Sequence, residues 1–193
     1  MSIKNWKTEI LTIPNLLSLF RLGIIPVYMT LYLTAETGQQ YLTAGILLAV
    51  SCVTDAADGI IARHFDMVTT LGKILDPIAD KITQFSLILC LSFRHGVLSY
   101  VLILFVIKEL FQLALGIINL QHRKILPGAL PEGKICTAVL FISLIFLVFF
   151  PNLSRPAVNT IAAVNTFFLI VSFAGYYMAY FGDHAKVQDF RIE

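Results

Sequence analysis

The chain has 193 residues, of which 58% are hydrophobic and only 13% are charged, and its formal net charge at pH 7 is +2. A soluble domain carries about 25% charged residues, so this composition excludes a soluble protein. The small net charge gives no reason to expect a nucleic-acid partner. We therefore predict one all-α integral membrane domain that covers residues 1–193.

Apolar runs that are long enough to cross a bilayer recur along the chain. A helix needs about 20 apolar residues to span the hydrocarbon core. The sequence predicts six transmembrane helices, at about residues 13–33, 41–61, 71–93, 97–120, 135–150 and 158–181. Before them, residues 3–11 alternate apolar and charged groups, which predicts a short interfacial helix, with a frayed terminus as the alternative.

The first predicted span contains Asn15 and Arg21. A charge about two turns into a membrane helix is costly, so we expect Arg21 to face a polar cavity or a carboxylate. The alternative is that its side chain extends to the membrane surface. Six positions separate the two residues, so both side chains could point to similar sides of the helix.

Acidic residues gather where the second and third predicted spans meet. Asp55 and Asp58 are three positions apart and Asp76 and Asp80 are four apart, so each pair shares one helix face. Carboxylates crowded at low dielectric repel one another unless a cation neutralises them. Oxygen ligands suit Mg²⁺ or Mn²⁺, and four carboxylates are enough for two ions. For one pair alone, solvated carboxylates at a helix end would be the simpler interpretation.

Two features between the acidic pairs indicate a phosphate ligand. Gly59 directly follows Asp58 and removes a side chain where a ligand could approach. Arg63 lies about one turn further on the same face and suits a phosphate oxygen. Lys81 follows Asp80 and could either offset the acidic cluster or reach a phosphate.

The whole stretch reads Asp-x2-Asp-Gly-x2-Ala-Arg-x8-Gly-x3-Asp-x3-Asp from Asp55 to Asp80. It resembles the signature of the CDP-alcohol phosphatidyltransferase family, and every fixed position is matched. The resemblance implies that a CDP-linked lipid gives its phosphatidyl group to an alcohol and releases CMP. It implies that Asp55, Asp58, Asp76 and Asp80 hold two metal ions, with Asp80 as the base for the incoming hydroxyl. The implied nucleotide and pyrophosphate contacts are Asp58, Gly59, Ala62, Arg63, Gly72, Lys81 and Asn15.

The fourth predicted span carries the adjacent charges Lys108 and Glu109 near mid-depth. Ionisable residues at that depth are candidates for a functional site. Neighbouring residues point about 100° apart on a helix, so we expect separate partners, with a mutual ion pair as the alternative. Lys134 opens the fifth predicted span, where a lysine and the helix amides could bind an anion.

These cations indicate an acceptor alcohol that carries a phosphate. The expected contacts are Lys108, Lys134, Arg21 and Arg123. The family resemblance supports Lys134 and Arg21, whereas many similar members of the family have arginine in place of Lys108. Glycerol 3-phosphate, giving phosphatidylglycerol phosphate, is our first expectation for the acceptor. Phosphatidylglycerol, giving cardiolipin, is the alternative. The expected partners are CDP-diacylglycerol, this alcohol, the lipid bilayer and, by resemblance to the family, a second copy in a homodimer.

Two other classes of protein compete with the transferase. A divalent-cation transporter with an acidic ring would explain the carboxylates, but an arginine such as Arg63 is unfavourable beside a cation path. A non-catalytic membrane scaffold would leave the charges inside the membrane unexplained. Release of CMP from CDP-diacylglycerol distinguishes the transferase from both.

The distribution of basic residues predicts the orientation in the cell membrane. With six spans, one side carries Lys4, Lys7, Arg63, Lys73, Arg123, Lys124, Lys134, Lys186 and Arg191, and the other carries only Arg94 and Arg155. Cytoplasmic loops are enriched in Lys and Arg, so both termini and the acidic cluster are expected to face the cytoplasm. In the sixth span, Asn159 and Asn165 are expected to form hydrogen bonds between helices.

Overall fold

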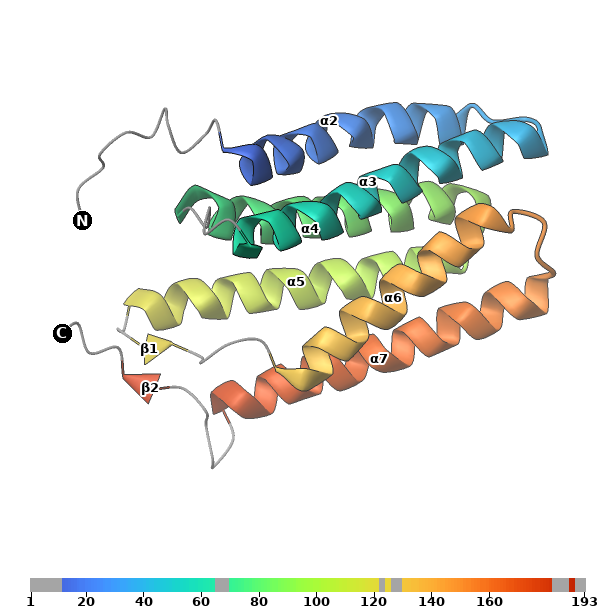
Figure 1. Ribbon diagram of the computed structural model, residues 1–193. Coiled ribbons are helices and arrows are strands. Elements are labelled where there is room, and N and C mark those ends of the chain that lie inside the picture. The colour runs from blue at the N-terminus through green and yellow to red at the C-terminus, as the bar shows by residue number, and fades with distance from the viewer. Residues whose placement is uncertain (1–11, 65–69, 122–123, 126–129, 182–187, 190–193) are drawn as a thin grey trace. The chain divides into compact units, whose positions relative to one another are not determined.

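The computed structural model describes residues 12–64, 70–121, 124–125, 130–181 and 188–189. These residues form six helices and two strands of two residues each (Figure 1). The helices are α2 (Ile13–Leu33), α3 (Gly38–His64), α4 (Thr70–Arg94), α5 (Leu98–Gln121), α6 (Pro131–Phe149) and α7 (Arg155–Phe181). The prediction of an all-α protein is confirmed, and each helix begins and ends close to a predicted span. Residues 3–11 lie outside the described residues, so the interfacial helix stays a prediction.

Apolar content makes this an integral membrane protein. Among the described residues, four helical segments are long and apolar enough to cross a bilayer: Asn15–Leu33, Leu98–Ile118, Pro131–Phe149 and Arg155–Phe181. Helices α3 and α4, which carry the acidic pairs, are not among them. Their 27 and 25 residues correspond to about 40 Å of helix, against a hydrocarbon core of about 30 Å. The count of six crossings therefore stays a prediction.

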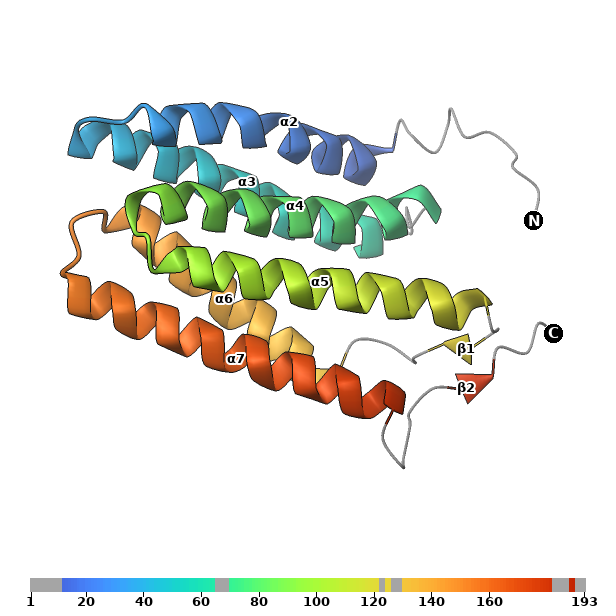
Figure 2. The ribbon, with the colours of Figure 1, turned by 180° about the vertical axis from the view of Figure 1, so that it is seen from behind.

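One compact unit contains α2, α3 and most of α4, together with Val148–Pro151. Helices α2 and α3 pack side by side (Figures 1 and 2). Tyr28 and Tyr32 of α2 are buried in this unit, and the Tyr32 ring centroid lies 5.3 Å from that of Tyr41 in an edge-to-face contact. These aromatic contacts join the end of α2 to the start of α3.

The start of α3 is fixed by a reciprocal cap between Thr37 and Gln40. The Gln40 side-chain oxygen accepts hydrogen bonds from the backbone amides of Glu36 (2.7 Å) and Thr37 (3.0 Å). The Gln40 amide donates to Thr37 Oγ1 at 3.4 Å. This is a capping box, which satisfies amides that have no partner inside the helix. It explains why α3 begins at Gly38 and not at residue 41, where the apolar run starts.

The second compact unit consists of Leu91–Leu147 and Asn152–Glu193. Within it, α5 and α7 pack side by side, and a polar contact joins α6 to α7. Asn165 of α7 is buried; its Nδ2 donates to Ser143 Oγ of α6 at 2.7 Å and to the Ile161 carbonyl at 2.9 Å. The predicted helix–helix hydrogen bond is therefore confirmed for Asn165. It is wrong for Asn159, whose side chain is exposed.

A short β-ribbon was not predicted. Strand β1 (Lys124–Ile125) pairs antiparallel with β2 (Gln188–Asp189), with Lys124 opposite Asp189 and Ile125 opposite Gln188. Strand β1 also contacts α5. Segments of two residues leave no periodic signal in a sequence, so pattern analysis could not find them.

Candidate functional site

Polar side chains of α2 meet the acidic pair of α4. Asn15, Ser18 and Arg21 are all buried, and their spacing of three residues places them along one stripe of α2. Ser18 Oγ donates to Asp76 Oδ1 at 2.5 Å, and Arg21 Nη1 donates to Asp80 Oδ1 at 2.6 Å. Two side chains of α2 therefore hold the two aspartates of α4, one turn apart.

Of the two surroundings predicted for Arg21, a polar cavity or a carboxylate, the structure shows a carboxylate partner. Its side chain is only 3% exposed, whereas that of Asp80 is 47% exposed. The alternative that Arg21 extends to the membrane surface is therefore wrong. A charge-assisted contact of this length offsets part of the cost of burying the guanidinium, and it fixes the orientation of the carboxylate. Asp80 thus combines a fixed orientation with access from outside the protein.

Ser18 is a contributor to this site that the sequence analysis missed. It lies midway between Asn15 and Arg21, on the face that both of them share. A hydroxyl at that spacing in an otherwise apolar helix was the available signal. Its hydroxyl donates to the partly buried carboxylate of Asp76.

The other half of the predicted acidic cluster lies at the end of α3. The α3 backbone is helical through Asp55, Asp58, Gly59, Ala62 and Arg63. The side chains of these residues lie outside the described part of the structure. Within the described part, no three His, Cys, Asp or Glu side chains are close enough to share a metal ion. Convergence of all four aspartates therefore stays a prediction.

The described donors fit a hard divalent cation. Asp76 and Asp80 supply only oxygen atoms from one face of α4, and both side chains are partly exposed. Ser18 binds one oxygen of the Asp76 carboxylate, and Arg21 binds one oxygen of the Asp80 carboxylate. Hydrogen-bond partners of this kind orient metal ligands in known sites. Oxygen-only donors suit Mg²⁺ or Mn²⁺ and argue against zinc.

Pro77 lies between the two aspartates. Helix α4 begins at Thr70, so Pro77 is inside the helix. Its missing amide leaves the Lys73 carbonyl without the usual partner four residues on. The helical hydrogen-bond ladder is thus interrupted beside the site.

Lys108 and Glu109 form an ion pair, contrary to our expectation of separate partners. Lys108 Nζ lies 2.9 Å from Glu109 Oε1, and the Lys108 side chain is only 5% exposed. The two side chains are long enough to bridge the angle between adjacent helical positions. Lys108 Nζ also lies 6.0 Å from the centre of the Tyr176 ring, a cation–π distance. Lys108 therefore joins α5 to α7 within the second unit.

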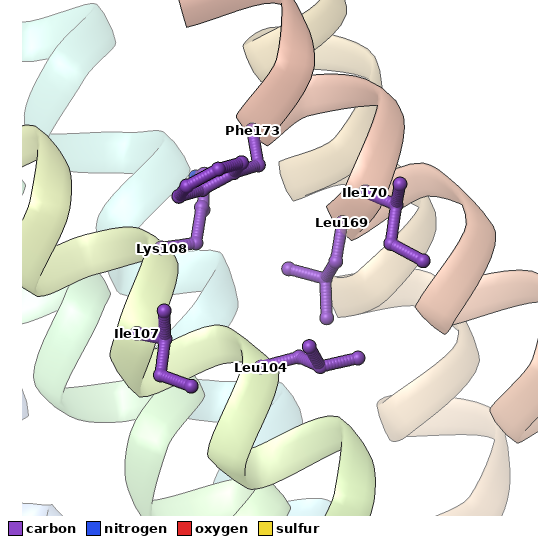
Figure 3. A pocket seen from close by; sticks show the side chains of 6 residues that line it. All are labelled: Leu104, Ile107, Lys108, Leu169, Ile170 and Phe173. Atoms are coloured by element: carbon purple, nitrogen blue, oxygen red, sulfur yellow. The ribbon is translucent and has the colours of Figure 1, made fainter. Parts of the chain in front are cut away.

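An apolar pocket of about 130 Å³ opens beside Lys108. Figure 3 shows Lys108 and Phe173 at one end of the pocket and Leu104 at the other. The remaining lining residues are Ile107, Leu169 and Ile170. The aliphatic part of the Lys108 side chain thus belongs to an apolar wall, while its amine pairs with Glu109.

Helix α6 begins earlier than residue 135, where the predicted span starts. Pro131 is the first helical residue and Glu132 lies in the first turn, both favourable choices for a helix N-terminus. Lys134 follows on an exposed position, and its amide donates to the Leu130 carbonyl at 3.1 Å. Lys134 is therefore accessible from the start of α6, whereas Arg123 lies outside the described residues.

Gly133 is held tightly against α7. A Cβ atom at this position would lie 2.8 Å from the Tyr176 hydroxyl and 2.9 Å from Cε2 of that ring. Contacts this short require the ring to move. The glycine thus sets the approach of α6 to Tyr176, the residue whose ring also faces Lys108.

The fold and the site together define a membrane protein whose helices hold oriented aspartates beside an arginine. The chain belongs to the CDP-alcohol phosphatidyltransferase family, because the sequence model of that family matches residues 11–177.

Several proteins of known name are similar to the chain. The CDP-diacylglycerol--glycerol-3-phosphate 3-phosphatidyltransferase of Aquifex aeolicus is 33% identical over 86% of this chain and 94% of its own length. The probable phosphatidylglycerophosphate synthase of Mycobacterium tuberculosis is 31% identical over 69% of this chain and 64% of its own length. The cardiolipin synthase (CMP-forming) of Streptomyces coelicolor is 39% identical, but over 45% of this chain and 41% of its own length.

Proposed function

We propose that the protein transfers the phosphatidyl group of CDP-diacylglycerol to glycerol 3-phosphate and releases CMP. The observation that carries this proposal is the similarity to the Aquifex aeolicus glycerol-3-phosphate phosphatidyltransferase along nearly the whole of both chains. Phosphatidylglycerol as acceptor, giving cardiolipin, is the second candidate, because a cardiolipin synthase matches a shorter part of the chain.

In this reaction the acceptor hydroxyl attacks the phosphorus atom that carries the diacylglycerol. A bond forms between that phosphorus and the acceptor oxygen, and the bond to the CMP oxygen breaks. We assign Asp80 as the base that takes the hydroxyl proton, because its carboxylate is both oriented by Arg21 and accessible. Arg21 is then a positioning residue for this base, and Ser18 has the same role for Asp76.

We assign Asp55, Asp58, Asp76 and Asp80 as ligands of two divalent cations, Mg²⁺ or Mn²⁺. Bound there, the ions would offset the charge of the pyrophosphate and of the departing CMP. Gly59, Ala62, Arg63, Gly72, Lys81 and Asn15 are assigned to the nucleotide and pyrophosphate. Asn15 and Gly72, both buried, support this assignment by lying on the same helices as Arg21 and Asp80.

Lys108 and Lys134 are assigned to the phosphate of the acceptor, with Arg123 as a further contact. Lys134 is exposed at the start of α6, where helix amides also favour an anion. Lys108 is paired with Glu109, so phosphate binding would have to compete with this carboxylate. Of the two lysines, Lys134 is thus the more direct contact.

For the orientation, we propose six crossings with the aspartates and both termini on the cytoplasmic side. Helices α3 and α4 have the length to cross the membrane although they carry acidic residues. The excess of Lys and Arg in the loops of one side supports this orientation. CDP-activated precursors would then reach the site from the cytoplasm.

The test of the activity is CMP release from CDP-diacylglycerol by the protein in lipid vesicles. We expect release with glycerol 3-phosphate and Mg²⁺ or Mn²⁺, and loss of release when a chelator removes divalent ions. Phosphatidylglycerol, serine and inositol phosphate serve as alternative acceptors in parallel reactions. Release only with phosphatidylglycerol would establish the cardiolipin alternative. If none of the acceptors in the panel supported CMP release, the transferase would be contradicted.

Asp80→Asn tests the assigned base. The amide keeps the size of the side chain but cannot take the proton, so kcat should fall by about two to three orders of magnitude. Glu36→Gln is the matched control, because Glu36 is an exposed acid in the loop between α2 and α3. Near-normal turnover by Asp80→Asn, with the protein still folded, would refute the role of Asp80.

A further inference from the structure

A second pocket lies in the second unit, and none of the residues that line it is assigned to the transfer reaction. Its volume is about 250 Å³, close to the lower limit of about 300 Å³ that is typical for ligand pockets. We call it the arginine pocket; its lining residues are Arg94, His95, Gly96, Val97, Arg155, Val158 and Asn159. They come from the end of α4, the turn before α5 and the first turns of α7.

Helix length and one exposed tyrosine place the arginine pocket at the expected border of the bilayer. Helices α5 and α7 both begin beside it, and β1 follows the far end of α5 (Figure 1). With 24 and 27 residues, these helices are about 36 and 40 Å long, enough to cross the hydrocarbon core of about 30 Å. Tyr100, which is 70% exposed, lies in the first turn of α5, and tyrosines of this kind mark the level of lipid headgroups.

The polar groups of the pocket suit an anion. Arg94 and Arg155 supply two guanidinium groups and Asn159 a carboxamide, and none of the described residues that line the pocket is acidic. The Arg94 side chain is oriented by Asn152, whose Oδ1 accepts from Arg94 Nη2 at 3.4 Å. Guanidinium groups bind phosphate oxygens through paired hydrogen bonds.

His95 adds a polar atom whose partner the described residues do not supply. Its Nε2 is buried and has no hydrogen-bond partner among them. Burial and the neighbouring Arg94 charge lower the pKa of His95 below its ordinary value, so the imidazole is neutral at pH 7. The positive charge of the pocket therefore comes from the two arginines, and His95 can donate or accept a hydrogen bond.

The placement of Arg155 is unfavourable without an anion. Arg155 is the first residue of α7, and a cation at a helix N-terminus opposes the helix dipole. The side of the membrane opposite the basic loops is normally poor in Lys and Arg. In this sequence Arg94 and Arg155 are the two basic residues that we predicted for that side, and both line one pocket.

We infer that the arginine pocket binds the phosphate of an anionic phospholipid in the leaflet opposite the basic loops. The two guanidinium groups of the pocket match a phosphate, and its two valines and its place at the helix ends match a headgroup whose acyl chains stay in the membrane. This lipid site is separate from the proposed reaction and does not depend on the identity of the acceptor.

The test measures lipid binding to the purified full chain in a non-ionic detergent. Native mass spectrometry counts bound phosphatidylglycerol, and thermal unfolding is followed with phosphatidylglycerol, phosphatidylcholine or inorganic phosphate. We expect Arg94→Gln/Arg155→Gln to lose one bound phosphatidylglycerol per chain and to weaken the apparent affinity at least about tenfold, since two charge-assisted contacts are removed. Phosphatidylcholine should stabilise the wild type and the double variant equally.

Matched variants make the outcome specific. Lys186→Gln removes one positive charge from the C-terminal tail and should keep both lipid binding and stabilisation. Arg94→Lys/Arg155→Lys keeps the charges and should restore part of the affinity. CMP release by the glutamine variant should match the wild type, which shows that it folds. Unchanged phosphatidylglycerol binding by the glutamine variant would overturn the inference. Equal stabilisation by inorganic phosphate would overturn the assignment to a lipid.

Discussion

Arg21 illustrates how single side chains position the proposed site. The guanidinium is almost fully buried, yet it binds a carboxylate that is about half exposed. Its depth in the first span predicted a polar cavity or a carboxylate, but spacing alone did not indicate which aspartate. That choice depends on how α2 packs in its unit, which no local pattern encodes. Ser18 was missed for the same reason, because this packing also determines that its hydroxyl meets Asp76.

Arg21→Gln should lower kcat by about 10- to 100-fold, the usual effect of removing a group that orients a ligand. Glutamine still fits the buried position but cannot offset the charge of Asp80. Arg21→Lys should recover part of the activity, and Ser18→Ala should cost less than Arg21→Gln. Steady-state CMP release at several divalent-ion concentrations measures these effects. Equal rates for Arg21→Gln and the wild type would show that Asp80 needs no positioning.

Gly133→Ala should destabilise the protein by about 1–3 kcal/mol, because the new methyl group overlaps the Tyr176 ring. Gly116→Ala is the control, since a Cβ atom there meets nothing within 4 Å. In a helix interior the control should be neutral or stabilising by up to about 1 kcal/mol. Unfolding in detergent with increasing denaturant compares the two. Equal stability of both variants would show that Tyr176 moves aside freely.

At the scale of the helices, hydrophobic runs predicted every helix of the described residues. Their ends were less accurate, because caps and not apolar residues determine them. The Thr37–Gln40 cap starts α3 early, and Pro131 starts α6 early. The prediction of separate partners for Lys108 and Glu109 was wrong, because these two residues pair with each other. Helix geometry gives the direction in which each side chain leaves the backbone, but not how far a long side chain bends.

Asn165→Ala should weaken the contact between α6 and α7. Hydrogen bonds between membrane helices are worth about 0.6 kcal/mol on average and up to about 1.7 kcal/mol. Loss of a buried side chain adds to this cost, so we expect about 1–3 kcal/mol. The neighbouring Val164→Ala, at a 41% exposed position, should cost much less. A loss in Asn165→Ala no larger than in Val164→Ala would contradict an energetic role for the Ser143 contact.

At the scale of the whole molecule, the orientation in the membrane rests on the distribution of charge. A chain in which all three cysteines are replaced can carry single reporters at Arg155→Cys or Lys186→Cys. In intact cells, a membrane-impermeant maleimide should label position 155 and label position 186 only after permeabilisation. The reverse pattern would invert the orientation and place the aspartates outside. A rate of CMP release that is unchanged in both reporters serves as the check on folding.

The ion pair between Arg21 and Asp80 also has a consequence for biosynthesis. The two residues are 59 positions apart in the chain, and ribosomes add about 5–20 residues per second. For several seconds after Arg21 is synthesised, the nascent chain therefore lacks Asp80, the partner of its guanidinium group. Inserting an arginine at the centre of a helix costs about 2.5–3.5 kcal/mol on the translocon scale. The apolar residues of α2 have to outweigh that cost until translation delivers the aspartate.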